Sequence, residues 1–151
     1  MDFGAAMFFA DYAMGPGEPA RTLEARGFES VWAPEHSHIP ISRDAVPQGG
    51  ELPKKYHEAM DPFVRLTAAA VATETLKVGT GVCLVTQRDP IQTAKLVASV
   101  DQVSRGRFLF GVGGGWNAEE MADHGTKFQT RFKLMREPHR GDEGDLDQVR
   151  G

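Results

Sequence analysis

Four short runs of hydrophobic residues recur along the chain, and helical patterns separate them. They lie at residues 3–9, 30–33, 77–82 and 107–112. Each run is apolar nearly throughout rather than alternating with polar positions, which is typical of parallel strands covered on both faces. Strands that each lead into a helix predict an α/β fold with a parallel sheet and right-handed crossovers.

The helical segments carry start and stop signals. Asp61 and Asp89 each precede a proline, a pattern that places a capping carboxylate before the first helical residue. Asn117, followed by two glutamates, predicts the start of a fourth helix, and Gly106 predicts the end of the third. The third helix is predicted to bury one apolar stripe, formed by Leu96, Val97, Val100 and Val103.

Two architectures fit this order of elements, a doubly wound sheet and a (β/α)₈ TIM barrel. Four strand–helix units occupy residues 1–137, whereas a complete barrel needs about 250 residues. As a barrel, the chain would hold the first four of eight units, an N-terminal half. Residues 138–151 are mostly charged residues and glycines, so we expect a disordered tail there.

Connections that lead from a strand to the next helix are long or unusual, whereas those that lead from a helix to the next strand are short. In parallel α/β folds, ligands bind at the carboxyl ends of the strands, where the long connections lie. Segment 37–60 is long enough to be a lid or a binding loop. The polar and aromatic residues expected at this edge are Asp11, Tyr12, Glu35, His36, His38, Thr86, Gln87, Arg88, Trp116 and Asn117.

The composition of the chain restricts the classes of partner and the cellular compartment that we expect for it. The 151 residues include 17 Lys and Arg and 21 Asp and Glu, a net charge of −4. We therefore expect no nucleic-acid partner and no polybasic membrane patch. Cys83 is the only cysteine, so no intramolecular disulfide can form, and we expect it to be a core hydrophobe. No apolar run approaches the roughly 20 residues of a membrane span, and no secretion signal is evident, so we expect a cytoplasmic protein.

His36 and His38 admit more than one interpretation. His36 could simply satisfy hydrogen bonds at the end of a strand. Because the two histidines are two positions apart, an extended backbone points both the same way. This spacing suits a metal in some barrel hydrolases, although a usable site needs further ligands.

The glycine-rich segment 111–116 (GVGGGW) resembles a dinucleotide-binding fingerprint only weakly. Its sixth position is Trp116, and no acidic residue ends a strand about 20 residues further on. One interpretation is a glycine turn with Asn117 only as the helix cap. The other is that the missing side chains let a flat ring or a phosphate approach the backbone. Arg88 likewise has two interpretations: it binds an anionic group, or it is a solvated surface side chain.

Several segments together carry a resemblance to a known family, and they follow one another as residues 27–36 (GFESVWAPEH), 78–82 (VGTGV), 110–117 (FGVGGGWN), 123–126 (DHGT) and 131–137 (RFKLMRE). In this order they resemble the luciferase-like monooxygenase family, especially its coenzyme F-420 (deazaflavin)-dependent oxidoreductases. The resemblance implies a TIM barrel that binds FMN or the deazaflavin at its carboxyl end, with hydride transfer there. It also implies that this chain matches only the N-terminal half of such a barrel.

The resemblance implies catalytic roles for two residues. Glu35 and His36 match the acidic–histidine pair after the second strand, where the histidine lies near the ring and relays a proton. We expect the cofactor to supply the redox chemistry and the protein to supply orientation and a proton donor.

The resemblance also indicates cofactor-binding residues. Gly81 and Val82 match a bulge in the third strand, often with a non-proline cis peptide, that backs the central ring. Trp116 or Asn117 matches the position after the fourth strand that contacts the cofactor. Thr86, in the loop after the third strand, completes this set of candidates.

Three functional hypotheses follow. The first is a flavin- or deazaflavin-dependent oxidoreductase acting on a small molecule. The second is a catalytically inactive fragment that only self-associates, because a half-barrel leaves its first and last strands unpaired and open to homo-oligomer formation. The third is a metal-dependent hydrolase that uses His36 and His38.

Overall fold

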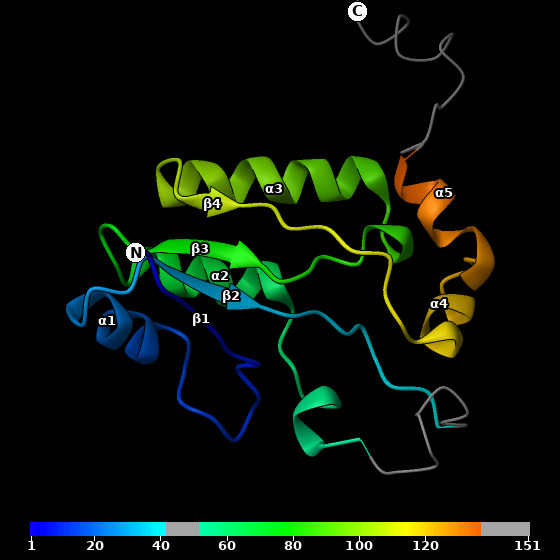
Figure 1. Ribbon diagram of the computed structural model, residues 1–151, viewed down its shortest axis with the longest axis horizontal. Helices are drawn as coiled ribbons and strands as arrows, with labels where there is room; N and C mark the ends of the chain where they lie inside the picture. The colour runs from blue at the N-terminus through cyan, green and yellow to red at the C-terminus, as the bar shows by residue number, and fades with distance from the viewer. Residues whose placement is uncertain (42–51, 137–151) are drawn as a thin grey trace, which may run out of the picture.

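The computed structural model describes residues 1–41 and 52–136 and shows a four-stranded parallel sheet in the order β1-β2-β3-β4 (Figure 1). The strands are β1 (Gly4–Ala6), β2 (Ser30–Ala33), β3 (Lys77–Thr80) and β4 (Phe108–Leu109). Sequential strands pair directly, each through one crossover, as the first strands of a barrel do. The predicted α/β class and its repeated units are confirmed.

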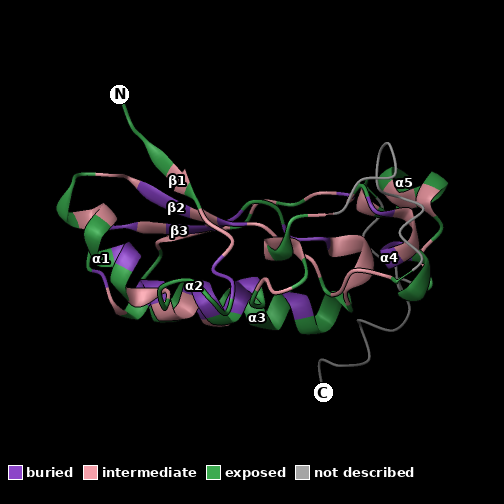
Figure 2. Ribbon diagram, turned by 90° about the horizontal axis from the view of Figure 1, so that it is seen from below, coloured by how far each residue is buried: buried purple, intermediate pink, exposed green. Residues whose placement is uncertain are grey.

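Three long helices pack on one face of the sheet (Figure 2). They are α1 (Gly17–Ala25), α2 (Pro62–Val71) and α3 (Pro90–Ser104). Beyond the carboxyl ends of the strands lie α4 (Ala118–Asp123) and α5 (Arg131–Arg136) (Figure 1). Between these elements lie single turns of 3₁₀ helix: η2 (Lys54–Tyr56), η3 (Val85–Gln87) and η4 (Phe128–Thr130).

The core lies between the sheet and these helices. Val31, Ala33 and Val78 are fully buried and pack against Leu66 and Ala69 of α2. Because side chains alternate along a strand, Trp32 lies on the opposite face. That face carries no helix in the described ranges, which corrects the expectation that both faces are covered (Figure 2).

Three of the four strands are shorter than the apolar runs predict. β1 stops before Phe9, whose φ of 49° is outside the extended region. Beyond β4, the chain stays beside β3 through a single bridge between Cys83 and Val112 and through the Thr80 hydroxyl, which bonds both backbone groups of Gly111. Apolar composition indicates burial here, but regular pairing extends over only part of each run.

The predicted helix caps are confirmed. Asp61 accepts hydrogen bonds from the backbone of Phe63 and Val64, and Asp89 accepts one from Gln92, at 2.8 to 3.2 Å. The α3 helix ends in the left-handed region at Arg105, followed by the predicted Gly106 (φ 79°).

The predicted apolar stripe of α3 is only partly correct. Val100 is buried, but Leu96 and Val103 are 37% and 46% exposed. The reason is position, because α3 packs beside the open edge of the sheet and contacts α2 and β4 along only part of its circumference. No helix in the described ranges is long and apolar enough to cross a membrane. The predicted tail, 138–151, lies outside the described residues.

Candidate active site

His36 and Glu120 form a buried pair at the carboxyl end of the sheet. Nδ1 of His36 lies 2.8 Å from Oε2 of Glu120, and the side chains are 6% and 0% exposed. Asn117 positions Glu120, since its side chain caps α4 by accepting from the backbone of Glu119 and Glu120. A carboxylate can only accept, so Nδ1 carries the proton, and Nε2 has no hydrogen-bond partner among residues 1–41 and 52–136.

The Glu120 carboxylate is also bonded to the segment after β2. Its Oε1 accepts hydrogen bonds from the backbone nitrogen of Ser37 (2.7 Å) and from the Ser37 hydroxyl (3.2 Å). Burial alone would raise the pKa of Glu120, but the hydrogen bonds from His36 and Ser37 outweigh it and lower the pKa below its usual value. Glu120 is therefore a charged, fixed acceptor that orients the His36 ring.

Aromatic rings surround His36. The Tyr56 and Trp116 rings lie 5.4 and 5.5 Å from the His36 ring, both edge-on, and Phe8 lies 4.9 Å from Tyr56. Trp116 is 41% exposed, and Val82, in the segment after β3, is 38% exposed. Apolar surface next to a histidine with one nitrogen available suits a flat ring with a polar edge.

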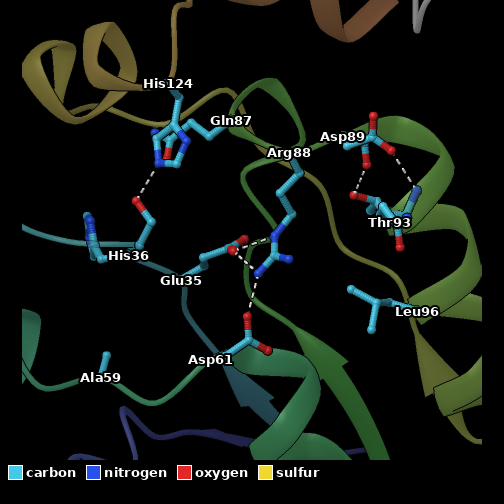
Figure 3. A pocket seen from close by; sticks show the side chains of 12 residues that line it. Glu35, His36, Ala59, Asp61, Gln87, Arg88, Asp89, Thr93, Leu96 and His124 are labelled. Atoms are coloured by element: carbon cyan, nitrogen blue, oxygen red, sulfur yellow. Dashed lines mark hydrogen bonds and ion pairs between the residues drawn. The ribbon is translucent and has the colours of Figure 1, made fainter.

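Glu35 lines the same hollow as His36, but its carboxylate bonds to the loop after β3 instead of to His36. Its carboxylate accepts from the backbone nitrogen of Leu84 and from Nε of Arg88, both at 2.6 Å. A second Arg88 nitrogen contacts Glu35 and, at 2.7 Å, Asp61 (Figure 3). Burial lowers the pKa of Arg88, but these bonds outweigh it and the pKa is raised. Arg88 is thus engaged within the protein, and Glu35 holds the loop after β3 in place.

A hollow of about 430 Å³ opens beside this ion pair (Figure 3). It lies between the segment after β2 and the first turns of α2 and α3. His124 closes one side, and its Nε2 lies in hydrogen-bond contact with the Ser37 hydroxyl at 2.7 Å. A second hollow, of about 1150 Å³, lies along α3, Phe108 and Phe110.

The predicted cofactor-binding residues are distributed over more than one place. The peptide bond between Gly81 and Val82 is cis, as the resemblance implies for this bulge. The Trp116 ring packs against the His36 ring. Asn117, the next residue, is 3% exposed and caps α4. Thr86 lines the second hollow, and its carbonyl accepts from the Thr126 hydroxyl, so it is not grouped with His36.

The structure explains why segment 111–116 is rich in glycine, and neither of the two interpretations from sequence included this explanation. A Cβ at Gly111 would lie 2.2 Å from the Thr80 carbonyl oxygen, and one at Gly113 would lie 2.3 Å from a methyl group of Val82. Gly115 has a φ of 73°, which favours glycine. These glycines let the chain after β4 run close beside the chain after β3.

His38 is bound to its own partners. Nε2 of His38 lies 2.8 Å from Oδ2 of Asp123, and Nδ1 lies 2.9 Å from the Ser37 hydroxyl. As its spacing predicts, it points toward α4, as His36 does. Within the ranges 1–41 and 52–136, no three His, Cys, Asp or Glu side chains are placed to hold a metal ion.

Cys83 packs with Phe63 and Val100 in a buried cluster. Burial raises the pKa of its thiol, so it is a core hydrophobe as predicted.

Sequence reasoning missed Glu120 and Tyr56. The spacing of Asn117 and Glu120 is that of a capping box, but it does not reveal that the glutamate turns toward a distant histidine. Tyr56 comes from η2 within the long connection after β2, and no local pattern marks it.

Residues 17–139 match the family described as luciferase-like monooxygenase. An uncharacterized protein of Mycobacterium tuberculosis is 40% identical over 141 residues, covering 91% of this chain and 50% of that protein. An F-420-dependent glucose-6-phosphate dehydrogenase of Amycolatopsis mediterranei is 30% identical over 126 residues, covering 80% of this chain and 34% of the enzyme.

A solved structure supports the same architecture. The oxygenating constituent of 3,6-diketocamphane monooxygenase from Pseudomonas putida, in complex with FMN, superposes with a TM-score of 0.71 at 18% identity. The superposition covers 91% of this chain and 36% of that chain. The four units therefore correspond to part of a larger fold, and the chain spans at most about half the length of these curated relatives.

Proposed function

The chain belongs to the luciferase-like monooxygenase family, and we propose that its His36 face is the proton-handling part of a flavin- or deazaflavin-dependent oxidoreductase site. The observation that carries the proposal is the buried 2.8 Å bond between His36 and Glu120 at the carboxyl end of the sheet. Relatives that depend on F-420 and a neighbour in complex with FMN support both cofactors as candidates.

The residues present fit such a ring. Trp116 and Val82 offer exposed apolar surface, Gly81 carries no side chain, and His36 adds one polar nitrogen. When bound, FMN or the deazaflavin would supply hydride transfer. Asn117 would help indirectly, by holding the start of α4 and therefore Glu120.

The protein's own groups then have separate tasks. His36 would hold or donate a proton at Nε2, because Nδ1 is committed to Glu120. Glu120 would fix the ring orientation and stabilise the charged imidazolium. Glu35, committed to Arg88 and Leu84, would position the loop after β3 instead of transferring a proton.

The substrate class we propose is a small molecule, supported by the hollow of about 430 Å³ that His36 lines together with Glu35 and Arg88. We propose the cytoplasm as the compartment, because the one cysteine is buried and forms no disulfide.

A direct test is titration of the chain with FMN and with coenzyme F-420, followed by the fluorescence anisotropy of each cofactor. We expect saturable binding of one of them. In His36→Gln, we expect binding to change little, while reoxidation of the bound reduced cofactor by a supplied two-electron oxidant, dissolved O₂ for FMN or an added acceptor for F-420, slows by about 10²–10⁴-fold. Unchanged reoxidation would remove His36 from proton handling, and no binding of either cofactor by the folded chain would overturn the proposal.

A second candidate function, an inactive chain that only associates, is favoured by one observation. β1 and β4 each pair on one side only within the described part of the chain. The same titration separates the two functions.

A further inference from the structure

Trp32 lies across the sheet on the face that carries no helix. Its register partner on β3 is Gly79. A Cβ at Gly79 would lie 2.6 Å from the six-membered ring of Trp32, and one at Gly4 of β1 would lie 2.9 Å from its Nε1. A Cβ at Gly111 would come within 3.6 Å of the same indole. One indole therefore extends over β1, β3 and the chain that follows β4.

The indole is held in this position. Its Nε1–H donates to the Ser30 hydroxyl at 2.9 Å, two residues earlier on the same strand. In a barrel interior, a layer is ordinarily filled by side chains from several strands. Here Gly4, Gly79 and Gly111 leave the space into which the Trp32 indole extends.

This layer lies directly below the candidate site. Gly81 is two residues beyond Gly79, which is about 7 Å along a strand, and the Cβ of Trp32 is 3.3 Å from the Cβ position of Gly81. His36 follows Trp32 by four residues, in the segment that continues β2 beyond Ala33.

We propose that Trp32 is a positioning residue that forms the floor of the ring site and sets its depth. A planar heteroaromatic ring would bind above the indole, against Gly81 and Val82, and the indole would keep water from reaching the ring from below. The inference rests on the proposed function, because the ring is the one proposed above.

The test uses the indole ring-proton resonances of the chain, above all Hε3 of Trp32, because Cε3 lies 3.7 Å from the Cβ position of Gly81 whereas Nε1 lies at Ser30 on the side of β1. The chain has two tryptophans, Trp32 and Trp116, and Trp32→Phe assigns their signals. On titration with FMN or F-420, we expect the Trp32 signal to shift saturably, with the dissociation constant found from the cofactor's own fluorescence. An aromatic ring shifts a proton signal only at short range, so the shift reports contact.

Substitutions complete the test. We expect Trp32→Ala to weaken binding about tenfold and Trp32→Phe to weaken it less, since a phenyl ring keeps part of the stacking surface. Ser30→Ala frees the indole without removing it and serves as the second variant if Trp32→Ala does not fold; we expect it to weaken binding about threefold. Cofactor binding that leaves the Trp32 signal unchanged would contradict the proposed role of Trp32 as the floor of the ring site, while the proposed function would stand. No binding of either cofactor would overturn both.

Discussion

The imidazole of His36 and the carboxylate of Glu120 are in hydrogen-bond contact although 84 positions separate them in the sequence. The contact joins the chain after β2 to the first turn of α4, so it spans two of the four strand–helix units. Both side chains are buried, and the carboxylate also accepts from Ser37. A histidine held in this way has one defined tautomer, and its second nitrogen bonds to no residue in the described part of the chain.

Replacing Glu120 by Gln should loosen this arrangement. The amide would direct N–H groups at donors on His36 or Ser37, so we expect the free energy of unfolding to fall by about 1–3 kcal/mol. We also expect the ¹⁵N shifts of His36 to show a mixture of tautomers. Glu18→Gln, an exposed substitution on α1, is the control and should change neither. A single, unchanged tautomer in Glu120→Gln would show that Glu120 does not orient the ring.

Replacing only one partner of the ion pair between Glu35 and Arg88 should lower the free energy of unfolding markedly. Their side chains are 4% and 20% exposed, so Glu35→Gln would leave a largely buried, weakly compensated cation. We expect urea denaturation to show a loss of about 3–5 kcal/mol, partly recovered when both residues are replaced by Met. The exposed pair of Arg105 and Glu74, 3.9 Å apart, provides the control, because Glu74→Gln should cost under about 0.5 kcal/mol. Equal effects of Glu35→Gln and Glu74→Gln would contradict the assigned role.

Acid should destabilise the fold through Glu24. The backbone hydrogen bond from Thr75, with further bonds from Leu76 and Glu74, lowers the pKa of Glu24 from 4.5 to about 2 despite the opposing effect of burial. A carboxyl with a lowered pKa in the folded state stabilises it at pH values above about 4.5. That contribution is lost as the pH falls toward about 2.

The matched variant for this prediction is Glu24→Gln. Because Glu24 is partly exposed, we expect the variant to be less stable than wild type by only about 1 kcal/mol at pH 7. The difference should shrink steadily between pH 4.5 and pH 2 in thermal unfolding followed by circular dichroism. A difference that stays constant over this range would rule out ionisation of Glu24 as its source.

The two outer strands should cause the chain to associate with itself. β1 and β4 each have an unpaired edge in the described ranges, and Phe110 beyond β4 is 41% exposed. We expect light scattering after size exclusion to show dimers of the 151-residue chain. Phe110→Lys should shift the distribution toward monomer, whereas Val71→Lys, at an exposed position on α2, should not. A stable wild-type monomer would contradict this prediction.

The fold class could be predicted because its signals are local. Apolar runs, prolines after Asp61 and Asp89, and a glycine at position 106 depend on neighbours in sequence. The structure places the caps and the glycine as predicted, and each apolar run contains a strand, although three of the strands are shorter than their runs. The location of His36 at the carboxyl end of β2 also follows from local pattern, because it comes directly after a buried strand.

The sequence by itself therefore determined the number and order of the strands, the starts of α2, α3 and α4, and the edge of the sheet at which chemistry is expected. Only the tertiary structure decided which partners those residues have: Glu120 and Tyr56 for His36, Arg88 for Glu35, and a set of glycines for Trp32. The physical reason is that strand alternation sets the face of a side chain, while its contacts depend on how distant segments pack. Those segments come together through loops whose paths no local periodicity records.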